Sequence, residues 1–303
     1  INMESLGVMR LAAFIPISLF SSTYSFNLSL NPFNPNSIIA KVNNNEAVEV
    51  DEWFTEVFNK SMEVSRNSDG VFDITCAPLV NLWGFGFNKK DSVTPAMIDS
   101  LKTFVGYRKV HLEGKKVVKD DPRLLLNCSA IAKGYSCDVI ARLLEKEGVE
   151  NYMILIGGEV VVKGVNQNGV CWRTGINLPE DDPDGIKNNY DEIVQLCKKG
   201  AIATSGNYRN FYIKDGKKYA HTIDPRTGYP AEQSVLSATI VANDCMTADA
   251  YATAFMAMGL EKARQMADSL PEIEYYVIYA DENGKHQIEY SKGMLQYLPK
   301  RKQ

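Results

Sequence analysis

The sequence lacks several features that would point to common functions. It has no basic block, and 33 Lys and Arg residues against 37 Asp and Glu give a formal net charge of -4, which argues against nucleic-acid binding. No run reaches about 18 uninterrupted apolar residues, so we predict no membrane-spanning helix. An acidic protein that handles a phosphorylated ligand needs local help, such as a metal ion or a helix N-terminus.

The six cysteines form no CxxC pair and no ladder of short spacings. This pattern argues against a zinc site and against a disulfide scaffold. We therefore predict scattered, free and buried thiols, and their presence does not settle the redox compartment. The cysteines are Cys76, Cys128, Cys137, Cys171, Cys197 and Cys245.

The N-terminal 40 residues carry only Glu4 and Arg10 as charges, and residues 8–20 are almost wholly apolar. One interpretation is the apolar region of a signal peptide. Because Arg10 lies within the apolar run and no clear cleavage site follows, we favour a buried strand pair at the start of the fold.

Hydrophobic periodicity predicts an α+β protein, a single domain over residues 1–303. Helices are predicted over residues 50–66, 94–103, 129–147, 247–258 and 260–270, with Thr247 as the cap of the fourth. Strands are predicted over residues 109–112, 116–119, 152–156, 159–163, 208–213, 217–222, 234–242, 274–280 and 285–290. Residues 67–86 and 178–191 are predicted to be loops.

Four segments are candidates for function. In the first, residues 69–86, glycines and a proline interleave with aromatic residues. Such a loop can lie against a planar ring, although an aromatic-rich loop that packs under a helix would have the same composition.

The second segment, residues 127–138, places small residues at the start of a predicted helix, with Lys133 one turn in. Backbone N–H groups at a helix start are open to an anion. Gly157-Gly158-Glu159 follows nearby, but it lacks the spacing of a dinucleotide fingerprint.

The third segment comprises residues 203–209 and 221–230. His221 is one of three histidines and lies beside a tight Asp-Pro-x-Thr-Gly turn. The residues alone leave a functional and a structural role for His221 equally open.

The fourth segment, residues 247–253, holds Asp249 and Thr253 four residues apart on a predicted helix, so both side chains leave the same face. A carboxylate and a hydroxyl are the hard oxygen ligands that Mg²⁺ takes together with ligand phosphates. A solvated Asp in the first turn of a helix would look the same.

Taken together, these segments resemble the ApbE family, the FAD:protein FMN transferases once labelled thiamine biosynthesis lipoproteins. The resemblance runs from about Leu28 to Leu260, with the motifs in the family's order. It implies a T-fold-like domain of antiparallel sheets backed by helices. The matching motifs also include Ser37 through Asn43 and Gly157-Gly158-Glu159.

The resemblance also implies the ligands. Mg²⁺ would be held by the Ala130 carbonyl, Asp249 and Thr253, with Asp249 and His221 as catalytic residues. FAD would be contacted by Phe33, Ala77, Pro78, Leu79, Asn127, Lys133 and His221. The chain departs from the family at Asn127, where a carboxylate is usual, and at Phe33, where a tyrosine is usual. The family's early Met-Gly-Thr motif is not recognisable in residues 1–26.

The implied activity is transfer of FMN from FAD to a Thr or Ser hydroxyl of an acceptor flavoprotein, such as a subunit of a membrane redox pump, with release of AMP. The implied location is the periplasmic side of a bacterial cell envelope, with a possible N-terminal lipid anchor. Three alternatives stay open: an FAD pyrophosphatase that uses water, a flavin-binding protein without turnover, and a structural envelope protein.

Overall fold

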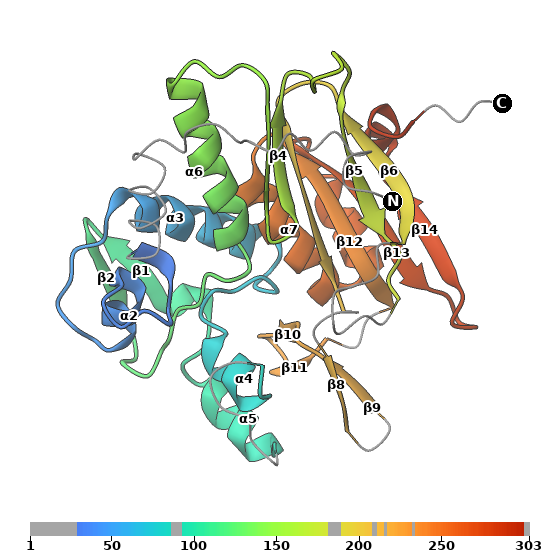
Figure 1. The fold of residues 1–303 in the computed structure, drawn as a ribbon. Helices are drawn as coiled ribbons and strands as arrows, with labels where there is room; N and C mark the ends of the chain where they lie inside the picture. The colour runs from blue at the N-terminus through green and yellow to red at the C-terminus, as the bar shows by residue number, and fades with distance from the viewer. Residues whose placement is uncertain are drawn as a thin grey trace.

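The computed structural model of the chain describes residues 29–85, 93–180, 189–207, 211–214, 217–231 and 234–299. The strand pair expected near the N-terminus falls on residues outside these ranges. The centre of the fold is a six-stranded antiparallel sheet in the spatial order β14-β13-β12-β7-β4-β3 (Figure 1). Its strands are β3 (Tyr152–Ile156), β4 (Glu159–Lys163), β7 (Gly200–Gly206), β12 (Val235–Ala242), β13 (Ile273–Ala280) and β14 (His286–Tyr290).

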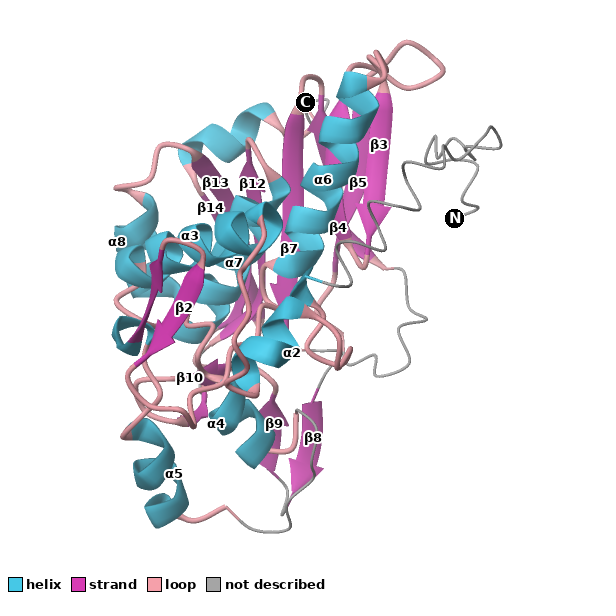
Figure 2. Cartoon of the chain, turned by 90° about the vertical axis from the view of Figure 1, so that its left-hand side faces the viewer, coloured by secondary structure: helices cyan, strands magenta, loops and turns pink. Residues whose placement is uncertain are grey.

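One face of the sheet is covered by helices (Figure 2). α7 (Cys245–Met258) packs on β7 and β12, and almost all of its residues are buried because α3 and α6 pack against it as well. A helix that is apolar all round is typical of such a central position. The other helices of this layer are α3 (Glu52–Asn67), α6 (Ala132–Lys146) and α8 (Leu260–Ala267).

α7 begins two residues before the predicted start. Its N-cap is Asp244, whose side chain accepts a hydrogen bond from the Thr247 N–H at 2.8 Å, so the prediction of Thr247 as the cap is wrong. Both residue types can cap a helix. Asp138 on α6 also accepts the N–H groups of Cys245 and Met246, each at 2.8 Å, which allows the helix to start earlier.

The opposite face of the sheet carries a two-stranded hairpin, β5 (Trp172–Asn177) and β6 (Tyr190–Leu196), which the sequence analysis did not predict. Trp172 and Leu196 are buried against side chains of the central sheet such as Val160. The middle of the central sheet is therefore buried on both faces, which explains why β4 and β12 are nearly continuous apolar runs, whereas the edge strand β14 alternates polar and apolar residues.

A disulfide joins Cys171 to Cys197 at the open end of this hairpin, so the prediction of free thiols is wrong for these two cysteines. Trp172 pairs with Leu196 in the hairpin register, and the two cysteines are therefore opposite each other one position further out. Their Cα atoms lie 4.4 Å apart, within the range that a disulfide requires. The other cysteines are free, and three of them are buried: Cys128, Cys137 and Cys245.

Smaller elements gather at one end of the sheet, at the bottom of Figure 1. They are α4 (Ala77–Leu82), α5 (Pro95–Lys102), β8 (Phe211–Lys214), β9 (Lys217–Ala220), β10 (Ile223–Asp224) and β11 (Tyr229–Pro230). α4 lies within the predicted loop 67–86, so that prediction is wrong for its six residues. Two further elements, the hairpin β1 (Val110–Glu113) and β2 (Lys116–Lys119) and the helix α2 (Ile38–Asn43), pack beside α3.

None of the helices in the described ranges is long and apolar enough to cross a membrane. The α+β class with antiparallel sheets backed by helices, predicted from the sequence, is confirmed.

Candidate active site

A cavity of about 370 Å³ lies where the four candidate segments meet. Its walls come from residues 71–85, from the start of α6, from the end of β7, from residues 221–223 and from one face of α7. Residues from Phe33 to Ala257, 224 positions apart in sequence, thus share one site, which is the typical form of a small-molecule site.

α6 and α7 touch at Gly134, and this contact fixes the position of Asp249. A Cβ atom at Gly134 would lie 2.2 Å from the Cys245 carbonyl oxygen and 2.8 Å from Asp249 Cβ, so only glycine fits. The Gly134 N–H donates to Asp249 Oδ2 at 2.9 Å. The Asp249 side chain is only 4% exposed, so it is held against the start of α6 by packing as well as by a hydrogen bond.

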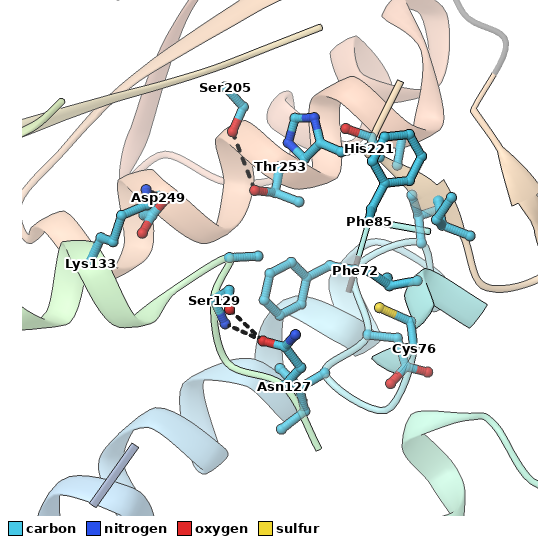
Figure 3. A pocket seen from close by; sticks show the side chains of 18 of the residues that line it. Phe72, Cys76, Phe85, Asn127, Ser129, Lys133, Ser205, His221, Asp249 and Thr253 are labelled. Carbon is cyan, nitrogen blue, oxygen red and sulfur yellow. Dashed lines mark hydrogen bonds and ion pairs between the residues drawn. The ribbon is translucent and has the colours of Figure 1, made fainter. Parts of the chain in front are cut away.

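Lys133 and Glu159 complete a cluster of three charged side chains with Asp249. The Lys133 ammonium is in direct contact with Glu159 Oε1 and lies 3.6 Å from Asp249 Oδ1. Glu159 comes from the first residue of β4, after the Gly157-Gly158 turn, and its side chain is 4% exposed. Figure 3 shows Lys133 beside Asp249 at one end of the cavity.

The pKa values of these groups reflect two buried carboxylates that share one ammonium. Burial raises the pKa of Asp249, although Lys133 and the Gly134 N–H oppose the shift. Burial also raises the pKa of Glu159, and the Asp249 charge raises it further. Burial alone would lower the pKa of Lys133, but the attraction of Asp249 and Glu159 outweighs it and the pKa is raised. With both carboxylates ionised, these three groups have a net charge of -1.

Thr253 lies one turn after Asp249 on α7, and its Oγ1 is 3.3 Å from Ser205 Oγ at the end of β7 (Figure 3). Ala130, just before α6, lines the same cavity. The structure thus brings together the predicted metal ligands Ala130, Asp249 and Thr253. No cluster of three or more His, Cys, Asp and Glu side chains suited to a metal occurs in the described part of the chain. The predicted metal ligands do not form such a cluster, because only one of them is a carboxylate. The others would be a hydroxyl, a backbone carbonyl and phosphate oxygens of the ligand.

Asn127 and Ser129 line the cavity between the charged cluster and the aromatic wall. Asn127 Oδ1 accepts the Ser129 N–H at 2.8 Å, and it also bonds the Ser129 hydroxyl. The Asn127 side-chain oxygen therefore stabilises the turn that leads into α6. The Asn127 amide nitrogen takes the place of the second oxygen of the carboxylate that the family resemblance led us to expect at this position. This nitrogen is a donor, whereas a carboxylate only accepts.

The other end of the cavity is aromatic. Phe72, Phe85, His221 and Phe33 all line it, and the Phe85 and His221 rings meet edge to face with centroids 6.5 Å apart. Phe33 is 67% exposed, so it lies at the open rim. Below, Lys133, Asp249 and Thr253, with Glu159 behind Lys133, are called the charged end, and Phe33, Phe72, Phe85 and His221 the aromatic end.

The Asp-Pro-x-Thr-Gly turn that follows His221 is held by its own contacts. Asp224 is buried and accepts the Arg226 N–H at 2.9 Å, and the Arg226 guanidinium donates to both oxygens of the same carboxylate. The Gly228 carbonyl accepts from Trp83 Nε1 at 2.8 Å, which connects the turn to the end of α4. The turn that the sequence placed beside His221 is therefore fixed at the edge of the cavity that His221 lines.

Three of the predicted FAD contacts do not line the cavity. Ala77, Pro78 and Leu79 are buried in α4, and Leu79 packs in a small core with Ile98. Their neighbours Cys76 and Val80 reach the cavity wall instead. The remaining predicted contacts, namely Phe33, Asn127, Lys133 and His221, all line it.

The sequence analysis gave no role to Glu159 or Ser205, although both occur in motifs that it named. Glu159 lies 26 residues after Lys133, and only the pairing of β3 with β4 and the packing of α6 bring them together. The glycine pair before Glu159 was the available indication, since it marks a turn that can approach another element closely.

Comparisons with known proteins agree with one another. A family model described as the ApbE family matches residues 13–277. A protein named FAD:protein FMN transferase from Vibrio cholerae is 38% identical over 250 residues, which cover 82% of this chain and 72% of that protein. A protein of the same name from Escherichia coli K12 is 34% identical, covering 78% and 69%. The solved structure of the flavin transferase ApbE from Vibrio cholerae superposes with a TM-score of 0.83 at 32% identity, covering 95% of this chain and 93% of that one.

Proposed function

The chain belongs to the ApbE family, and from this premise we propose that it is an Mg²⁺-dependent FAD:protein FMN transferase. It would bind FAD, move the FMN half to a Thr or Ser hydroxyl of an acceptor flavoprotein through a phosphoester bond, and release AMP. The observation that carries the proposal is the single cavity with a charged end and an aromatic end. FAD has a pyrophosphate and a planar isoalloxazine ring, which these two ends complement.

The residues at the charged end fit a magnesium ion. Asp249 and Glu159 are buried carboxylates that share one ammonium, and a bound cation would compensate the remaining negative charge. The ion would be held by Asp249, Thr253 and the Ala130 carbonyl. Mg²⁺ when bound would supply electrostatic stabilisation to the pyrophosphate as charge shifts during transfer.

The chain's own residues have distinct tasks in the reaction. The acceptor hydroxyl oxygen forms a bond to the FMN phosphorus, the bond from that phosphorus to the bridging oxygen breaks, and AMP leaves. Lys133 at the start of α6 binds the pyrophosphate through its positive charge. The backbone N–H groups at a helix N-terminus favour an anion at the same place. His221 lines the same cavity, and it either orients the phosphate or takes the hydroxyl proton.

One experiment separates this function from its two nearest alternatives. The protein is incubated with FAD, Mg²⁺ and a candidate acceptor domain, and the intact mass of both proteins is measured together with AMP. A transferase adds the FMN mass to the acceptor in step with AMP. Free FMN and AMP with an unmodified acceptor would identify a pyrophosphatase, and the absence of AMP would leave a flavin-binding protein.

We further propose that the chain acts on the periplasmic side of a cell envelope, on an acceptor such as a subunit of a membrane redox pump, with a lipid anchor as a possible attachment. The Cys171–Cys197 disulfide supports an oxidising compartment. Thiol counting on protein isolated from the envelope with and without reductant tests it. Two additional thiols after reduction are expected, and a cytosolic pool with both thiols free would contradict the location.

A further inference from the structure

Glu159 is a buried carboxylate for which the proposed reaction has no direct use. It does not line the cavity, so it has no route to FAD or to the acceptor. Its Oε1 contacts the Lys133 ammonium, and its Oε2 is buried with no hydrogen-bond partner among the described residues. A buried carboxylate is costly unless it is paired, so its position needs an explanation.

The turn before Glu159 closes on the same lysine. Gly157 has φ +65, and a Cβ atom there would lie 3.1 Å from Lys133 Cδ and 3.2 Å from Glu159 Oε2. Glycine therefore lets the turn, the lysine stem and the carboxylate pack together. The Lys133 ammonium is consequently in direct contact with Glu159, and its ion pair with Asp249 Oδ1 is the longer of the two, at 3.6 Å.

We propose that Glu159 is a positioning residue that binds the Lys133 ammonium more closely than Asp249 does, and so keeps the Asp249 carboxylate available to a divalent cation. This inference rests on the proposed function, because it takes Asp249 as a metal ligand. A lysine is a compact charge on a flexible stem. Without the Glu159 charge, the ammonium would turn to Asp249 and occupy the oxygens that the cation needs.

Two carboxylates around one lysine then have separate tasks. Glu159 fixes where the positive charge lies, and Asp249 offers its Oδ1 to the cation while its Oδ2 accepts from Gly134. Residues that orient metal ligands without touching the metal typically change metal affinity about 10–100-fold when they are mutated. We expect a change at the lower end of this range, since Glu159 acts through a lysine.

The test compares wild type with Glu159→Gln, which keeps the shape and removes the charge. Calorimetric titration of Mg²⁺ in the presence of FAD and without acceptor gives the apparent Mg²⁺ affinity. We expect about tenfold weaker binding in Glu159→Gln, and an intermediate value in Glu159→Asp, which keeps the charge on a shorter side chain. Thermal melting checks that each variant is folded. If Glu159→Gln does not fold, Glu159→Asp serves as the test.

A crystal structure of metal-free Glu159→Gln distinguishes positioning from a simple loss of charge. The proposal requires the distance from the Lys133 ammonium to Asp249 Oδ1 to shorten in that variant from 3.6 Å to that of a direct charge-assisted hydrogen bond, about 2.8 Å. If Mg²⁺ affinity is unchanged, or if it falls while Lys133 stays in place, the proposal is overturned. If wild type itself binds no Mg²⁺ with FAD, the metal part of the proposed function fails, and this inference fails with it.

Discussion

At the two ends of the cavity, Asp249 and the rim residue Phe33 differ in how firmly their side chains are fixed. At the charged end, Asp249 is 4% exposed and is held where α6 and α7 meet at Gly134. At the aromatic end, Phe33 is 67% exposed at the rim. Fixed charges in a water-poor site stabilise developing charge well because they do not need to reorganise. The difference suggests that the charged end sets the rate of transfer, whereas the aromatic end contributes mainly to flavin affinity.

The largest effect should come from Asp249→Asn, which keeps the shape and removes the charged metal ligand. A bound metal can contribute several kcal/mol to the transition state, and about 1.4 kcal/mol is a factor of ten in rate. We expect a loss of roughly a hundredfold or more in FMN transfer. The melting temperature of the ligand-free protein should stay level or rise, because a buried carboxylate charge is removed.

Thr253→Val provides the graded control for this prediction. It removes one oxygen at nearly constant volume, and high Mg²⁺ should partly restore its activity. Transfer rates across a range of Mg²⁺ concentrations give both effects. Near-wild-type transfer by Asp249→Asn would place the metal site elsewhere.

Lys133→Ala should have the next largest effect, about a tenfold loss of FAD affinity, comparable to a hydrogen bond with a charged group. Riboflavin lacks the pyrophosphate, so its binding should be weaker in wild type and unchanged in the variant. Calorimetric titration with both ligands under matched Mg²⁺ tests the two statements. Equal loss for both ligands, or a variant that unfolds with unchanged FAD affinity, would make Lys133 structural.

The sequence predicted most of the elements that carry this cavity but not all of their contacts. The predicted strands 152–156 and 159–163 coincide with β3 and β4, because strongly apolar runs end at the Gly157-Gly158 turn. The hairpin β5–β6 was missed, since its strands mix polar and apolar residues and its burial depends on a sheet formed by distant segments. The Cys171–Cys197 bond was missed for the same reason.

Among the site residues, too, contacts between distant segments could not be predicted from the sequence. Asp249 and Thr253 share a helix face, so their spacing alone predicted that both side chains leave the same side of α7, whereas their role as metal ligands came from the family resemblance. Lys133 contacts Glu159, and Thr253 contacts Ser205, only because α6 and β7 pack against other elements of the fold. A local sequence pattern carries no information about such packing. Ala77, Pro78 and Leu79 were placed at the cavity by family resemblance, yet their side chains are buried in α4, whose residues pack inward.

The pH dependence of stability should come in part from two buried carboxyls outside the charged end, Asp138 and Asp73. Burial raises the pKa of Asp138 to about 7, with Asp244 adding to the shift and Arg142 and the N–H groups of Cys245 and Met246 opposing it. Between about pH 4 and pH 7 the folded state keeps a proton that the unfolded state has lost, so stability falls as pH rises. The slope is at most about 1.4 kcal/mol per pH unit for one group.

Asp138→Asn should flatten this slope in melting experiments on the ligand-free protein. Asp73, which accepts the Thr75 and Tyr107 N–H groups beside the aromatic end, has its pKa raised by burial to about 6. Asp73→Asn should therefore flatten only the lower part of the window. An unchanged slope in both variants would mean that neither carboxyl keeps its proton in the folded state.

The smallest effect should come from Phe33→Ala. Aromatic contacts contribute about 0.5–1.5 kcal/mol beyond burial, so we expect FAD and riboflavin to bind between about twofold and tenfold more weakly. The rate of transfer at saturating FAD should be unchanged, because the variant leaves the charged end intact. A loss of rate without a loss of affinity would show that the rim takes part in the chemistry.

The need for a cation at the charged end can be measured on the wild-type protein itself. FMN incorporation into the acceptor is measured by intact mass over a range of Mg²⁺ concentrations and in excess EDTA. We predict that incorporation in EDTA falls to the level of a reaction without enzyme and returns when Mg²⁺ is added. Full incorporation in excess EDTA would show that transfer needs no cation at this site.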